Sequence, residues 1–166
     1  VQSPGESVQF RDLYPGVEFV ETELVGDLFK KPHLVRIYAL MQQAVRFSEP
    51  VMLMNSDIEV RCSKEEFESR WAAPKSRTLV MGVRWDEDPV TKVAKIQKWG
   101  IDAFLITPSI VGDVIDLGLS MGCPAWDYWI PLHLSKIGYQ IITHKHNDLI
   151  HESHPLNWSR DDYDIG

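Results

Sequence analysis

The sequence predicts an α/β fold in which one sheet lies between layers of helices, and three observations support this expectation. Two continuous apolar runs, residues 51–54 and 103–106, are typical of strands covered on both faces, as in a parallel sheet. Helical periodicity in residues 33–47 and 127–137 alternates with these runs. A length of 166 residues and a hydrophobic fraction of 44% suit one globular domain, which we expect over residues 1–166.

The N-terminal third is expected to start irregularly and then to form one strong helix. Residues 6–13 favour a short helix, residues 17–20 alternate as in a strand, and residues 26–32 are expected to form a loop. Pro32 suits the first turn of the helix expected at 33–47. The apolar residues of that helix recur at three- and four-residue spacing: Leu34, Ile37, Tyr38, Met41, Ala44 and Val45.

The later elements follow from a cap, from apolar runs and from alternation. Ser63 and Glu66 fit a capping box at the start of a helix that ends near Trp71. Gly138 is placed to end another helix. The further elements that we expect are strands at 79–85, 103–106 and 139–143 and helices at 111–119 and 127–137.

The apolar run Val51–Met54 ends in three polar residues, Asn55, Ser56 and Asp57. Ligands of open α/β sheets bind at the carboxyl ends of strands, so these side chains are candidates for a binding site. The carboxylate of Asp57 is a hard oxygen ligand suited to Mg²⁺ or Mn²⁺, which commonly bridge a carboxylate to substrate phosphates. The same three residue types also favour a turn or a helix cap, and this alternative stays open.

A histidine cluster lies in the C-terminal part of the chain. Four of the six histidines, His144, His146, His151 and His154, fall within eleven residues. Imidazole is the commonest metal ligand near neutral pH, and residues two apart on a strand face the same side. The cluster follows an expected strand, so it could lie near Asp57. The alternative is a polar tail whose histidines bind nothing.

The stretch Trp126-Asp127-Tyr128-Trp129 surrounds one carboxylate with three aromatic rings. Aromatic faces pack against the C–H faces of sugars, and burial would raise the pKa of Asp127, which suits a general base. The alternative is that Asp127 caps a helix beside tryptophans of the core.

Composition excludes several classes of function. The net charge of −7 argues against a nucleic-acid partner, which would require a basic face. Cys62 and Cys123 form neither a disulfide framework nor a CxxC pair. We find no apolar run long enough for a transmembrane segment and no signal peptide, which favours a soluble, cytoplasmic protein.

These stretches, taken in order, resemble GT-A nucleotide-sugar glycosyltransferases over about residues 17–158. Asn55-Ser56-Asp57-Ile58 resembles the metal-binding Asp-X-Asp stretch of that family, and residues 100–104 resemble the strand entry beside the donor sugar. Residues 121–129 look like the segment that carries the acceptor site and, in inverting members, the catalytic base. The histidine-rich tail to Trp158 is similar to the region in which many members place a last metal-ligating histidine.

The resemblance implies a three-layer α/β/α GT-A-like fold with a mixed sheet and a function in glycosyl transfer of the hexosyltransferase type. It implies a nucleotide-sugar donor, a carbohydrate or other hydroxyl acceptor, and Mn²⁺ or Mg²⁺ as cofactor. Asp57 would hold the cation, with His154 as the first choice for a second ligand and His151 as the next. Asp127 would be the catalytic base. The remaining implied residues are donor-binding Lys31, Arg36, Asn55 and Asp102 and acceptor-binding Trp126 and Trp129.

Two departures from the family pattern are visible. Asn55 stands where the first aspartate of Asp-X-Asp is expected, and the opening strand–helix–strand unit that holds the nucleotide base has no counterpart, so we expect a fold shortened at its N-terminus. Two other functions compete with glycosyl transfer. One is a metal-dependent hydrolase that uses His144, His146, His151 and Asp57 around an activated water, and the other is a non-catalytic carbohydrate-binding or interaction module.

Overall fold

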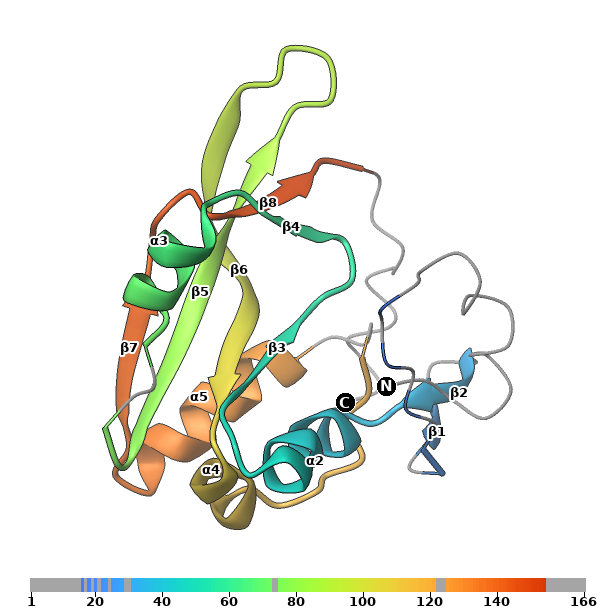
Figure 1. The fold of residues 1–166 in the computed structure, drawn as a ribbon. Coiled ribbons are helices and arrows are strands. Elements are labelled where there is room, and N and C mark those ends of the chain that lie inside the picture. Colours follow the sequence, from blue (N-terminus) through green and yellow to red (C-terminus); the bar gives the residue numbers. More distant parts are fainter. Residues whose placement is uncertain are drawn as a thin grey trace.

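A mixed sheet of six strands forms the centre of the computed structural model, with helices on both of its faces (Figure 1). The structure describes residues 16, 18, 20, 22, 23, 25–28, 31–72, 75–121 and 125–154. The elements are β1 (Val25–Leu28), β2 (Lys31–Val35), α2 (Ile37–Phe47), β3 (Val51–Met54), β4 (Ile58–Val60), α3 (Lys64–Arg70), β5 (Thr78–Glu87), β6 (Ala94–Ile106), α4 (Pro108–Asp113), α5 (Trp126–Lys136), β7 (Gln140–His144) and β8 (Leu149–Glu152). The predicted α/β class and the mixed sheet are confirmed.

The pairing of β3 differs from the parallel sheet that its apolar run suggested. β3 pairs only with β6 in the six-stranded sheet, and the pairing is antiparallel, with Val51 opposite Ile106. The expectation of a central, parallel strand was therefore wrong. The run is continuously apolar because this edge strand is covered on both faces: Val51 and Leu53 pack on one hydrophobic core, and Met52 and Met54 pack on the other.

β5 is the central strand, and its pairing changes on both edges between Gly82 and Trp85. On one edge β6 runs antiparallel, and on the other edge β7 and then β8 run parallel to β5. Val83 and Trp85 lie opposite Ile101 and Ile96, so residues 97–100 bulge out of β6. Such bulges re-aim side chains and are common beside functional sites.

Two hydrophobic cores lie on the two faces of the sheet, as the alternation of β6 requires. Phe104 and Ile106 point to the core beneath α2, α4 and α5, whereas Ala103 and Leu105 point to the core that includes Phe67 of α3. The first core is the larger. Its fully buried residues are Met41, Ala44, Leu79, Phe104, Ile106, Ile110, Ile130 and Leu134.

Several predicted elements are confirmed, and three were placed wrongly. The strands at 51–54, 79–85 and 139–143 and the helix at 127–137 are present within about three residues of their predicted bounds. The strand expected at 103–106 is the end of β6, which begins nine residues earlier, at Ala94. Residues 26–28 and 31–32, within the stretch expected to form a loop, belong to β1 and β2. The helix expected from residue 33 begins at Ile37 because Arg36 is extended. The helix expected at 111–119 is α4, which ends at Asp113.

The Ser63 capping box is also confirmed: the Ser63 Oγ accepts from the Glu66 N–H at 3.2 Å, and the Glu66 Oε2 accepts from the Ser63 N–H at 3.0 Å. β4 and β8 were not predicted from the sequence. The expected helix at 6–13 and residues 17 and 19 of the expected strand at 17–20 lie outside the described residues.

Gly82 offers a direct test of this packing. A Cβ atom there would lie 2.5 Å from Leu149 Cδ1 and 2.5 Å from the Trp71 ring, so Gly82→Ala must displace two buried side chains. We expect a loss of about 1–3 kcal/mol in the free energy of unfolding, measured by urea denaturation. Gly112→Ala is the control, because a Cβ there meets nothing within 4 Å and the helix of Gly112 favours alanine. Equal stability of the two variants would contradict the packing described here.

Candidate functional site

Three potential metal ligands from separate parts of the chain meet at one edge of the sheet. Asp57 lies in the turn between β3 and β4, His151 lies in β8, and His154 follows β8. The Nε2 atoms of both histidines lie 3.6 Å from Asp57 Oδ2 and 3.1 Å from each other. The antiparallel pairing of β4 with β8, with Ile58 opposite His151, brings them together. The predicted proximity of Asp57 to His151 and His154 is confirmed.

The spacing of these donor atoms fits a divalent cation. Histidine nitrogens and carboxylate oxygens bind such ions at about 2.0–2.2 Å, so neighbouring ligands of one ion lie roughly 3–3.6 Å apart. The three donor atoms lie within 4.8 Å of one another. Carboxylates suit Mg²⁺ and Mn²⁺, whereas imidazoles suit zinc and other transition metals, so a set with two imidazoles favours a transition metal over Mg²⁺.

His151 is held in the orientation that a metal ligand requires. Its side chain is buried, and its Nδ1 lies 3.1 Å from the Oδ1 of Asp86, the residue opposite it on β5. A carboxylate on Nδ1 fixes the proton there and leaves the Nε2 lone pair directed at Asp57 and His154. Sequence reasoning missed Asp86, because the expected strand at 79–85 ends one residue before it. Continuing the alternation of the strand at 79–85 by two residues would have placed Asp86 in β5.

Replacing Asp86 with Asn tests this support. Asn keeps the shape of the side chain and removes the charge that holds the Nδ1–H, so we expect about 10–100-fold weaker Mn²⁺ binding, measured by isothermal titration calorimetry. Asp88→Asn is the matched control, because Asp88 accepts from the backbone N–H groups of Val90 and Thr91 at the tip of the β5–β6 hairpin. Unchanged Mn²⁺ affinity in the Asp86 variant would show that His151 does not depend on this contact.

Arg84 connects the metal-ligand group to Asp102. Its Nε lies 2.8 Å from Asp86 Oδ1, and its Nη1 lies 3.2 Å from Asp102 Oδ2. Both contacts are ion pairs without hydrogen-bond alignment. The other oxygen of Asp102 accepts from Asn55 Nδ2 at 2.6 Å, so the two expected donor-binding residues Asn55 and Asp102 contact each other. Burial raises the pKa of Asp102, and Arg84 opposes that rise.

Asp127 lies in the first turn of α5 and not at its N-cap, which is Ala125. Burial, aided by the nearby charge of Asp102 and opposed by the backbone N–H groups of Asp127 and Tyr128, raises the pKa of Asp127 to about 6. The alternative that Asp127 is a helix cap is therefore wrong. A carboxylate with this pKa is ionised at neutral pH and is a stronger base than an exposed aspartate, which suits proton abstraction.

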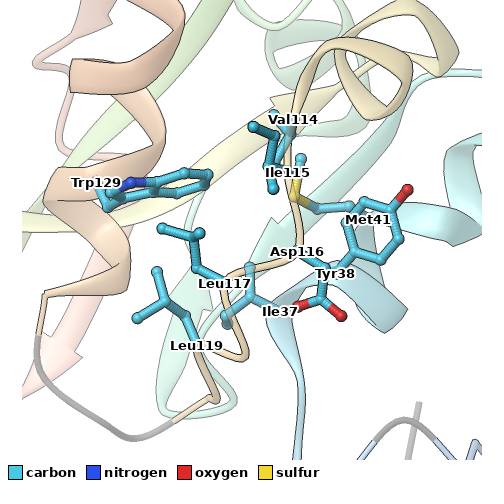
Figure 2. A pocket seen from close by; sticks show the side chains of 9 residues that line it. All are labelled: Ile37, Tyr38, Met41, Val114, Ile115, Asp116, Leu117, Leu119 and Trp129. Atoms are coloured by element: carbon cyan, nitrogen blue, oxygen red, sulfur yellow. The ribbon is translucent and has the colours of Figure 1, made fainter.

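Of the two tryptophans expected to line an acceptor site, one is buried in the core and the other lines a pocket. Trp126 is buried in the core against Phe104, with 5.4 Å between ring centroids, so the expected role in an exposed acceptor wall was wrong. Trp129 stacks on His133 and lines a small, open, mostly apolar pocket between α2, α5 and the segment after α4 (Figure 2). The other residues around that pocket are Ile37, Tyr38, Met41, Val114, Ile115, Asp116, Leu117 and Leu119.

The remaining predicted site residues do not join the Asp57 group. Arg36 pairs with Asp116 at 3.2 Å, beside the pocket of Figure 2. Lys31 lies in β2, where only the backbone is described. His144 packs on the Trp71 ring with 4.9 Å between centroids, and His146 lies next to His144. In the described part of the chain, the metal-ligand group includes neither of these two histidines.

Comparison with known proteins adds no assignment: no family model, no curated protein and no solved structure matches this chain. Among the described residues, no helix combines the length and the apolar character that crossing a membrane would require. The case for a function therefore depends on the geometry of the site.

Proposed function

We propose that this chain carries the metal and acceptor sites of a GT-A-like glycosyltransferase, which moves a sugar from a nucleotide-sugar to a hydroxyl acceptor. The observation that supports this proposal best is the meeting of Asp57, His151 and His154. Asp57 belongs to the stretch that resembles Asp-X-Asp, and the two histidines belong to the C-terminal region that resembles the last metal ligand of that family.

The three side chains would hold Mn²⁺ in preference to Mg²⁺. When bound, the cation would supply a Lewis acid that neutralises the charge on the diphosphate leaving group. Asp86 holds His151 through its Nδ1, and Arg84 pairs with Asp86. Asn55 and Asp102, which contact each other beside this group, are the residues we assign to the donor sugar.

Asp127 acts in this proposal as the general base of a single displacement. The acceptor oxygen forms a bond to the anomeric carbon, the bond from that carbon to the diphosphate oxygen breaks, and the electron pair leaves with the diphosphate. The acceptor proton goes to the Asp127 carboxylate. A pKa of about 6 supports this role, because the group is deprotonated at neutral pH yet basic enough to accept the proton as the new bond forms.

Nucleotide binding tests the proposal. We expect UDP or GDP to bind the full chain in the presence of Mn²⁺ and not in its absence, as measured by isothermal titration calorimetry. His151→Ala should abolish this binding, whereas His146→Ala should leave it unchanged, because His146 lies outside the metal-ligand group. Tight Zn²⁺ binding with no nucleotide binding would support a hydrolase instead, and sugar binding that needs neither metal nor nucleotide would support a non-catalytic module.

A further inference from the structure

Trp99 is the most exposed of the described tryptophans, with 75% of its surface accessible to solvent. It lies in the bulge of β6 formed by residues 97–100, opposite Arg84 of β5. A bulge of this kind turns side chains away from the regular sheet surface, which explains how a large indole ring in a long strand stays in solvent.

The bulge is fixed at both ends to parts of the candidate site. Gln97 donates from its Nε2 to Asp86 Oδ2 at 3.2 Å, and Asp86 is the residue that holds His151. At the other end, the Tyr128 hydroxyl donates to the Trp99 backbone carbonyl, and Tyr128 directly follows Asp127. The bulge that contains Trp99 therefore connects Asp86, which holds His151, to the first turn of α5.

The first turn of α5, which the Tyr128 hydroxyl joins to the backbone of Trp99, combines aromatic surface with a carboxylate that can bind hydroxyls. Tyr128 is 42% exposed, and the carboxylate of Asp127, the preceding residue, is ionised at neutral pH. Ligand sites typically combine apolar or aromatic walls with a few polar groups that set orientation. A pyranose ring has an apolar C–H face, which stacks on an indole, and a hydroxyl rim, which a carboxylate can bind.

We propose that Trp99 is the stacking platform for the pyranose ring of the acceptor carbohydrate, beside Asp127. The inference rests on the proposed function, glycosyl transfer to a hydroxyl acceptor, and specifies that this acceptor is a hexopyranoside. It replaces Trp126, which is buried, and Trp129, which faces the pocket of Figure 2, as the aromatic surface of the acceptor site.

Saturation-transfer NMR with methyl glycosides of glucose, galactose, mannose and N-acetylglucosamine tests the platform on the full chain. We expect at least one glycoside to bind, Trp99→Ala to weaken that binding by about tenfold or more, and Trp99→Phe, which keeps a flat ring, to retain most of it. Phe47→Ala is the matched control, because Phe47 is another exposed aromatic residue, at the end of α2. Since Trp99 is mostly exposed, its variants should keep the circular dichroism spectrum of the parent.

The inference is overturned if no glycoside binds the parent chain, or if Trp99→Ala binds the glycosides as well as the parent does. Mn²⁺-dependent nucleotide binding is measured on the same samples and separates the two proposals. Nucleotide binding together with glycoside binding that ignores Trp99 would overturn the platform alone. Glycoside binding that depends on Trp99, without any nucleotide binding, would overturn the glycosyltransferase and support the platform as part of a carbohydrate-binding module.

Discussion

Asp57→Ala is expected to abolish metal-dependent binding of nucleotide diphosphates. Asp57 is the only anionic member of the metal-ligand group, and its Oδ2 lies 3.6 Å from both Nε2 atoms of the histidines. Its loss leaves two neutral imidazoles, which attract a divalent cation far more weakly than a set with a carboxylate does. Calorimetry with Mn²⁺ alone and with Mn²⁺ plus UDP or GDP measures the effect.

Glu59→Ala is the control for this experiment. Glu59 is an exposed carboxylate two residues further along the chain, and it pairs with Arg61 outside the metal-ligand group. Without metal, both variants should melt close to the parent, because the Asp57 side chain is itself 46% exposed. Retained Mn²⁺ affinity in a folded Asp57→Ala protein would mean that the three side chains do not form a metal site.

Asp127→Asn is expected to reduce turnover by about 10²–10⁴-fold while donor binding is largely kept. Asn preserves the shape of the side chain and cannot accept the proton of the acceptor. Initial rates with a nucleotide-sugar donor and a hydroxyl acceptor measure the loss. Parent activity should also fall as the pH drops below about 6, since burial raises the pKa of Asp127 to about 6 and the protonated acid is no base.

Asp127→Asn is expected to stabilise the folded chain at neutral pH, although it reduces turnover. Because the pKa of Asp127 is higher in the folded chain than in the unfolded chain, the folded chain binds this proton more tightly. The resulting stabilisation is complete below about pH 4 and is lost as the pH rises through about 6. Asp127→Asn should therefore raise the melting temperature relative to the parent at pH 7 more than at pH 4.

Glu65→Gln is the matched control for Asp127→Asn. Glu65 occupies the same second position of a helix, in α3, but is exposed to solvent. Its replacement should change neither turnover nor the pH dependence of the melting temperature. If Asp127→Asn were fully active, the assignment of the base would be wrong, while the metal centre would still stand.

The sequence indicated which residues are potential metal ligands, but not the contacts that hold them in place. Asp57 and the histidines stood out because a polar break after an apolar run and a local excess of imidazole are both visible along the chain. Asp86 could not be recognised, since its role depends on the residue that lies opposite it across β5 and β8. Trp126 was misjudged for the same reason, and Trp99 was not singled out: neighbours in the folded chain, not in the sequence, decide which aromatic ring is buried.

The fold was predictable where local patterns agree with the final packing. The capping box at Ser63 and the apolar runs of β3 and β6 are such places. The pattern was misleading at residues 33–36, where apolar spacing favours a helix but pairing of β2 with β1 extends the chain up to Val35. β4 has three residues, too few to show any period, and it pairs only with β8 in the sheet.

That last pairing sets the order in which the ribosome can complete this protein. β4 is synthesised before its partner β8, residues 149–152, so the segment that carries Asp57 cannot pair with β8 until those residues have been made. The carboxylate and the two imidazoles meet only when β8 inserts between β5 and β4. In the proposed metal site, the three ligands are therefore available together only after β8 has paired with β4.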